Sequence, residues 1–313
     1  MLQVPNPLLV RLWQIAHWCG VVPPLGLATE YRWALVCHDM FEAGSIDVLN
    51  YAAHHLHAAY PELEYVAKLV QLFDAAPRHL PPPRPFRNDP AADVQIVRNP
   101  DSDAVLLCFC AAQGTLGLPV NFVHQWLGRL PASLVYLKDS RDHFGAVGFP
   151  SLAPDRAGSI AALRDLVNKL GGKRIYTFGV SRGGYAAAYY GLELGALGVL
   201  SLAGATDLTP AFVESLPPVQ DVYTRMLRAA PDYATNLADR YRSATRRPHV
   251  RIAFSSGYLR DRAQAERMAD VPDVVLTPVS GKVQHNVIDL LIQQGTLMDM
   301  LNRLLAAGEA HGS

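Results

Sequence analysis

The chain has no excess of charge of either sign. Its 28 lysine and arginine residues balance 28 aspartate and glutamate residues over 313 positions, so the formal net charge is zero. Proteins that bind nucleic acid or anionic membrane surfaces usually carry a basic patch or a basic excess. The composition gives no sign of either, and we expect neither nucleic acid nor a polybasic membrane contact among the partners.

Cysteine is also scarce. The chain has four cysteines, Cys19, Cys37, Cys108 and Cys110. Cys108 and Cys110 are two residues apart in an apolar run and too near each other for a useful disulfide bridge. Few cysteines in a chain of this length are typical of a reducing compartment. We therefore interpret all four as reduced core thiols and expect a cytoplasmic protein.

A leader or membrane segment is not evident at the N-terminus. Arg11 and His17 interrupt the apolar stretches there, Pro23 and Pro24 follow, and no small-residue cleavage site is clear. A membrane-spanning helix needs about 20 mainly apolar residues in succession. We expect neither a signal peptide nor a transmembrane helix.

The most informative segment brackets a serine with two glycines, in Gly179-Val180-Ser181-Arg182-Gly183. An apolar run at 174–178 precedes it and an alanine-rich stretch follows, which predicts a strand, a sharp turn and a helix. On such a turn the glycines remove side chains that would clash where strand and helix cross, and the serine hydroxyl is exposed. We predict that Ser181 is a nucleophile. The alternative is a tight-turn serine without chemistry.

Residues 7–75 show helical spacing of apolar residues and no strand-like alternation. A break at 43–45 makes Ser45 a plausible N-cap, and Pro61 fits the start of a further helix. The segment loosely resembles one helical hairpin of the tetratricopeptide kind, which cannot bury its own face alone. We expect residues 1–80 to be a helical extension packed on the next domain, with a partner-binding module as the alternative.

A proline-rich linker at 81–90 separates this extension from a second region at 91–308. The second region alternates apolar β-runs with helical patterns, which predicts an α/β fold: a mostly parallel sheet with helices on both faces. The β-runs lie at 93–98, 104–110, 133–138, 174–178, 197–202, 249–255 and 273–277. About forty residues at 205–248 lack a strand, and we expect them to form a small helical cap. Its apolar residues should line a pocket: Val213, Leu216, Val219, Tyr223, Met226 and Leu227.

A serine nucleophile needs a histidine base and an acid that orients it. His285 follows the last β-run and precedes the C-terminal helix, as expected for the base in the order serine, acid, histidine. The alternative is a surface histidine that caps a helix. Asp261, after the run at 249–255, is the expected acid, although it could instead cap the next helix. Asp207, after the run at 197–202, is its substitute.

Two backbone N–H groups should stabilise the oxyanion. One is that of Arg182, directly after the nucleophile, and the other comes from the loop 111–117, where we choose Ala112. The Arg182 side chain either binds a substrate anion or pairs with an acid. The polar run 138–143 leaves a strand at its carboxyl end, so it either borders the same crevice or is only a solvated loop.

With these motifs, residues 91–308 resemble the α/β-hydrolase superfamily. The resemblance implies an eight-stranded-type sheet, a triad of Ser181, Asp261 and His285, no cofactor, and a cap after the run at 197–202. The sequence departs from the family's pattern in two places. Loop 111–117 lacks a lipase-like glycine signature, and Gly257 and Asp261 are separated by one residue more than in the commoner Gly-x-x-Asp spacing. The implied function is hydrolysis of a small-molecule carboxylic ester through an acyl-enzyme. Thioester hydrolysis or acyl transfer, and a non-catalytic interaction protein using the N-terminal helices, remain alternatives.

Overall fold

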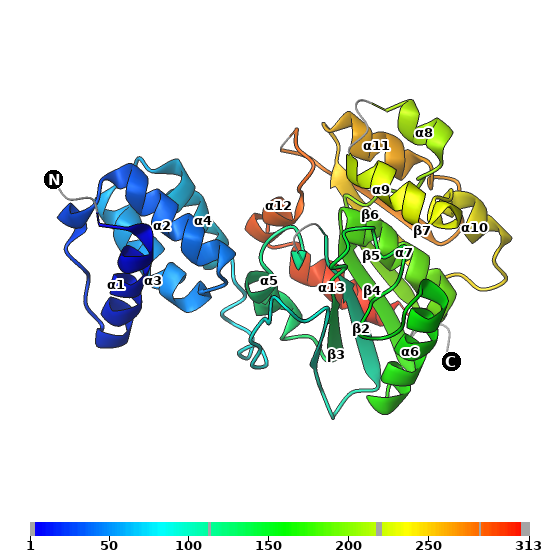
Figure 1. The fold of residues 1–313 in the computed structure, drawn as a ribbon, viewed down its shortest axis with the longest axis horizontal. Helices are drawn as coiled ribbons and strands as arrows, with labels where there is room; N and C mark the ends of the chain where they lie inside the picture. The colour runs from blue at the N-terminus through cyan, green and yellow to red at the C-terminus, as the bar shows by residue number, and fades with distance from the viewer. Residues whose placement is uncertain (1–3, 112–113, 217–220, 282, 308–313) are drawn as a thin grey trace.

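The computed structural model describes residues 4–111, 114–216, 221–281 and 283–307. The described residues contain one seven-stranded sheet, in which the strands follow the order β1-β3-β2-β4-β5-β6-β7 (Figure 1). Only β1 is antiparallel to its neighbour, and the other six strands are parallel. The strands span Val94–Val97, Ala104–Phe109, Ser133–Leu137, Arg174–Val180, Gly198–Leu202, His249–Ser255 and Val274–Val279.

Helices cover both faces of this sheet, which confirms the predicted α/β class. Strands β2, β3 and β5 are buried along their whole length, because a parallel sheet between two helical layers has no solvent face. One layer contains α5 (Val120–Leu127), α12 (Ile288–Gln293) and α13 (Leu297–Ala306). The other contains α6 (Arg156–Lys169), α7 (Arg182–Leu194) and α11 (Leu259–Glu266). The described sheet has one strand fewer than the family resemblance implies.

The N-terminal extension is helical, as the sequence predicts. It consists of α1 (Asn6–Cys19), a 3₁₀ turn (Leu25–Leu27), α2 (Glu30–Glu42), α3 (Ile46–Ala59) and α4 (Glu64–Asp74). The expected break at 43–45 is present, but the Ser45 side chain makes no capping hydrogen bond. The expected helix start at Pro61 is wrong, because Pro61 lies in a turn three residues before α4.

The extension packs on the sheet domain through aromatic side chains. The ring of Phe122, on α5, lies edge-on to Phe41 and Phe73, with centroids 5.6 and 5.3 Å apart. These residues belong to one continuous apolar core that also includes strand residues. The division of the chain into an extension at 1–80, a linker at 81–90 and a second domain at 91–308 stays a prediction.

Short helices fill the segment between β5 and β6, as expected for the cap: α8 (Pro210–Glu214), α9 (Asp221–Ala229), a 3₁₀ turn (Pro231–Tyr233) and α10 (Leu237–Ser243). Tyrosine hydroxyls on α7 and in this segment form hydrogen bonds that join the segment to α7. The Tyr185 hydroxyl donates to the Tyr233 carbonyl at 2.7 Å, and the Tyr241 hydroxyl donates to the Ala188 carbonyl at 2.8 Å. Both hydroxyls are buried, so each hydrogen bond offsets the cost of removing a polar group from water.

The four cysteines are all free thiols. Cys37, Cys108 and Cys110 are buried, and burial raises the pKa of Cys37 and of Cys110 to about 12. The expectation of a core position is wrong for Cys19, which is exposed because it is the last residue of α1. No helix among the described residues is both long enough and apolar enough to cross a membrane.

Strand β4 and helix α7 pack so closely that glycine is required at their crossing. A Cβ atom on Gly179 would overlap the Gly183 carbonyl, and one on Gly183 would overlap the Phe109 carbonyl. We expect Gly179→Ala to lower the free energy of unfolding by about 1–3 kcal/mol or more, because backbone cannot yield as a flexible side chain can. Gly26→Ala is the control, since a Cβ there would meet nothing within 4 Å. Urea unfolding with equal midpoints for both variants would contradict this packing.

Candidate active site

Ser181 occupies the sharp turn between β4 and α7. Its backbone has φ 55° and ψ −121°, a conformation that L-residues rarely adopt. The Ser181 N–H donates to the Leu202 carbonyl at 2.7 Å, which ties the turn to the end of the neighbouring strand β5. Strained backbone of this kind persists only where surrounding contacts fix it, and it is concentrated at functional sites.

The structure brings Ser181, His285 and Asp261 together. His285 lies in the loop between β7 and α12, and its Nε2 is 2.6 Å from the Ser181 Oγ. The other ring nitrogen, Nδ1, is 2.8 and 3.0 Å from the two carboxylate oxygens of Asp261. Asn286 fixes this loop, since its Nδ2 donates to the Gly117 carbonyl at 2.8 Å. The hydroxyl, imidazole and carboxylate therefore form one hydrogen-bonded chain.

The Asp261 carboxylate contacts the His285 imidazole and does not cap its own helix. It lies in the first turn of α11, where a carboxylate could cap the helix, but both oxygens face the imidazole. The carboxylate is buried, with 4% of the residue exposed. Burial raises the pKa of Asp261, and the hydrogen bond from His285 opposes that rise only in part.

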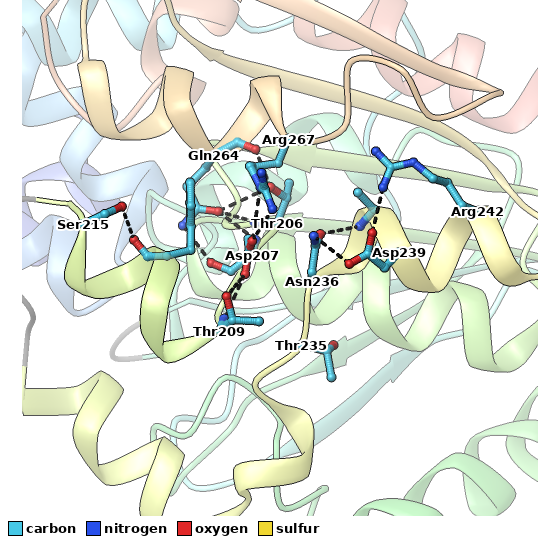
Figure 2. Close-up of polar contacts among 12 residues, drawn as sticks. Thr206, Asp207, Thr209, Ser215, Thr235, Asn236, Asp239, Arg242, Gln264 and Arg267 are labelled. Carbon is cyan, nitrogen blue, oxygen red and sulfur yellow. Dashed lines mark hydrogen bonds and ion pairs between the residues drawn. The ribbon is translucent and has the colours of Figure 1, made fainter.

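Asp207, the substitute acid, is engaged elsewhere (Figure 2). Its Oδ1 accepts hydrogen bonds from the N–H and hydroxyl of Thr209, at 2.9 and 2.6 Å. Its Oδ2 lies 3.0 Å from Nη2 of Arg267. Asp207 is 1% exposed and makes these contacts away from His285. Of the two candidate acids, only Asp261 contacts the imidazole.

Gln264 is a residue that sequence reasoning missed. Its Oε1 accepts from the N–H groups of Thr206 and Asp207 at 2.7 and 2.9 Å, and its Nε2 donates to the Asp207 carbonyl at 3.1 Å. Figure 2 shows it facing the segment that follows β5. Gln264 is three residues after Asp261, on the same side of α11, so it fixes the helix that carries the acid. The spacing of three residues from Asp261 was the only feature of the sequence that pointed to Gln264.

The Arg182 side chain pairs with an acid, the second of its two expected roles. Its guanidinium donates to Asp142, and the Nη2 of Arg225, on α9, is 3.6 Å from the same carboxylate. Asp142 follows β3 and belongs to the run 138–143 that we expected to border the site. Phe144, just beyond that run, also has a left-handed backbone, with φ 61°.

A pocket of about 180 Å³ opens at Ser181 and His285. Its apolar wall consists of Phe144, Ala203, Ala205, Leu208, Val213 and Tyr223. Val213 and Tyr223 are two of the cap residues expected to line it, whereas Met226 is fully buried in the core and Val219 lies outside the described residues. The pocket is therefore small and closed by the segment between β5 and β6.

The expected oxyanion donors have different outcomes. Arg182 is the first residue of α7, so its N–H is one of the N-terminal groups that a helix leaves without an internal acceptor. Ala112 lies outside the described residues, and its role stays a prediction. Within the described ranges, no group of three or more His, Cys, Asp and Glu side chains is arranged to hold a metal ion.

Comparisons with known proteins give matches among solved structures alone. No protein-family model and no curated protein matches the chain. Among solved structures, esterase 2 of Thermogutta terrifontis, phosphonylated by sarin, has a TM-score of 0.49 and 14% identity over 68% of this chain and 88% of that one. The capsule O-acetyltransferase of Neisseria meningitidis serogroup A has a TM-score of 0.48 and 9% identity, over 67% and 92%. The described sheet order, with Ser181 on the turn between β4 and α7, gives the chain an α/β-hydrolase fold.

Proposed function

We propose that the protein is a serine hydrolase that cleaves a carboxylic ester through an acyl-enzyme on Ser181. The observation that carries the proposal is the chain of hydrogen bonds from the Ser181 Oγ to His285 and on to Asp261, at 2.6 and 2.8 Å. A serine hydroxyl needs a base within hydrogen-bond reach, and the base needs an acid that fixes its tautomer.

In this mechanism His285 Nε2 takes the hydroxyl proton as Ser181 Oγ attacks the ester carbonyl carbon. The tetrahedral oxyanion accepts a hydrogen bond from the Arg182 N–H, at the positive end of α7. The C–O bond to the alcohol then breaks, and His285 gives its proton to the leaving oxygen. Water, deprotonated by the same imidazole, attacks the acyl-enzyme and releases the acid and Ser181. Asp261 stabilises the imidazolium at each stage.

The small apolar pocket favours a short acyl group. Its volume of about 180 Å³ is below the several hundred Å³ that is usual for a small-molecule pocket. Leu208, Val213 and Tyr223 would contact the acyl chain. Thioester hydrolysis and acyl transfer use the same three residues and remain the alternative, since they differ only in the leaving group or in the acceptor. A strained serine argues against a purely non-catalytic role.

A fluorophosphonate probe tests whether the serine is activated. We expect one equivalent to label the wild-type protein and none to label Ser181→Ala, because only a hydroxyl beside its base reacts readily. Intact mass measures the labelling, and p-nitrophenyl esters of rising acyl length then measure turnover. Circular dichroism of Ser181→Ala controls for folding. Absence of labelling in the well-folded wild type would reject the proposal and favour the interaction-protein alternative.

The two buried acids should respond differently to amidation. We expect Asp261→Asn to lower kcat by about 10³–10⁴-fold, because the imidazole loses the partner that fixes its tautomer. Asp207→Asn should keep kcat within about threefold and instead lower the thermal midpoint, since it weakens the contact with Arg267. Full activity in Asp261→Asn, or a large loss of kcat in folded Asp207→Asn, would reverse the assignment.

Stability should depend on pH differently in the Asp261→Asn variant. Burial raises the pKa of Asp261 in the folded protein, so the folded state binds this proton more readily than the unfolded state. The ionised carboxylate therefore opposes folding above its unfolded pKa of about 3.9, and protonation relieves this cost at lower pH. We expect the stability of Asp261→Asn relative to wild type to increase between pH 3 and pH 7. Urea unfolding measures it, and a constant difference would contradict the argument.

A further inference from the structure

A cavity of about 520 Å³, separate from the pocket at Ser181, lies at the same edge of the sheet. Its walls come from the turn between α2 and α3, from residues 88–93 before β1, and from the loops that follow β2 and β3. Because β1 is antiparallel, its start lies at the carboxyl edge of the parallel strands. Crevices at this edge are where open α/β sheets bind their ligands.

The two cavities draw on different sides of the strand that precedes Ser181. In the strand order, β4 lies between the β1-β3-β2 side and the β5-β6-β7 side, and Ser181 follows β4 directly. The pocket at Ser181 draws residues from the segments after β5 and β6, whereas the larger cavity draws them from the other side. Asp142 connects the two sides, since it lines the larger cavity and accepts a hydrogen bond from Arg182, the neighbour of Ser181.

The N-terminal extension supplies part of this cavity and is held firmly there. Gly44 and Glu42 line it, at the turn after α2. The Asn121 Nδ2, on α5, donates to the Gly44 carbonyl at 3.1 Å, and the Asn121 Oδ1 accepts from the Asn88 N–H at 3.1 Å. Gly44 has φ 68°, and a Cβ atom there would overlap the Asn121 side chain. The wall formed by the extension therefore has a defined position.

The lining mixes apolar and polar side chains, and its charged groups are more often acidic than basic. No aromatic ring lines the cavity in the described residues, and its single cation, the Lys138 Nζ, donates to the Asp89 carbonyl at 2.7 Å. Asp139 accepts hydrogen bonds from backbone N–H groups of its own loop, and Asp142 is paired with Arg182. Glu42 is exposed, and the described residues offer its carboxylate no hydrogen bond or ion pair. Such an acceptor binds hydroxyl donors and repels anions.

We propose that this cavity takes the alcohol part of the ester, and that this alcohol bears further hydroxyl groups and no negative charge. The inference rests on the proposed function. It assigns the acyl chain to the small apolar pocket and the alcohol to the larger cavity on the other side of β4. Glu42 then gives the N-terminal extension a part in substrate selection.

The test compares esters that share one acyl group, butyrate. Glyceryl monobutyrate offers two hydroxyl groups, n-propyl butyrate offers none on the same carbon skeleton, and the butyrate ester of 3-hydroxypropanoate offers a carboxylate. For the wild type we expect kcat/KM to be at least about tenfold higher for the glyceryl ester than for the propyl ester, because a hydrogen bond to a charged acceptor adds binding. The carboxylate ester should have the lowest kcat/KM of the three.

Variants at two exposed glutamates separate the site from general charge effects. Glu42→Gln should reduce the ratio of kcat/KM for the glyceryl ester to kcat/KM for the propyl ester about fivefold or more. Glu42→Lys should raise kcat/KM for the carboxylate ester relative to kcat/KM for the glyceryl ester. Glu62→Gln, on the same extension and outside the cavity, should leave both ratios unchanged.

The two hypotheses fail in different ways. Equal kcat/KM for glyceryl and propyl esters, or a ratio unaffected by Glu42→Gln, would overturn this inference while Ser181-dependent hydrolysis stood. Absence of Ser181-dependent hydrolysis of all three esters would overturn the proposed function and this inference with it.

Discussion

The close backbone contact between β4 and α7 is the constraint on which the rest of the structure depends. Gly179 leaves no room for a side chain beside the Gly183 carbonyl, so β4 and α7 approach more closely than other residues allow, and Gly183 likewise lets α7 approach the Phe109 carbonyl of β2. The chain between β4 and α7 must then turn sharply, which holds Ser181 at φ 55°. Its N–H contact with Leu202 carries that constraint to β5, from which the segment bearing Asp207 continues.

That segment in turn holds the helix that carries Asp261. Gln264 joins α11 to the backbone of Thr206 and Asp207, and the same helix carries Asp261. Asp261 and Asp207 are both almost fully buried, yet Asp261 faces an imidazole and Asp207 faces a guanidinium. An imidazole can exchange a proton near neutral pH, whereas a guanidinium stays charged. The chemical difference between the two acids therefore lies in their partners and not in their burial.

The sequence predicts most of the fold, and Ser181 and His285 within it, because strand periodicity and the glycine-bracketed serine are local signals. The choice between Asp261 and Asp207 could not be made from local signals, since both follow a strand and both precede a helix. Which carboxylate meets the histidine depends on how α11 packs. Phe144 was missed for a similar reason: its approach to the pocket depends on a left-handed backbone in a loop held by Asp139 and by the Tyr233 hydroxyl.

In the proposed mechanism, the reacting groups and the groups that select the alcohol lie on different sides of β4. Ser181, Asp261 and His285 follow β4, β6 and β7, so their hydrogen-bonded chain lies on β4 and on the β5-β6-β7 side. The other side of β4, at the same carboxyl edge of the sheet, carries the loops after β2 and β3 and the helical extension, which is fixed through Phe122 and Asn121. Residues such as Glu42 can change there without moving the glycine-packed turn. Under this proposal, the extension shares the core of the sheet and shapes substrate choice while contributing no catalytic group.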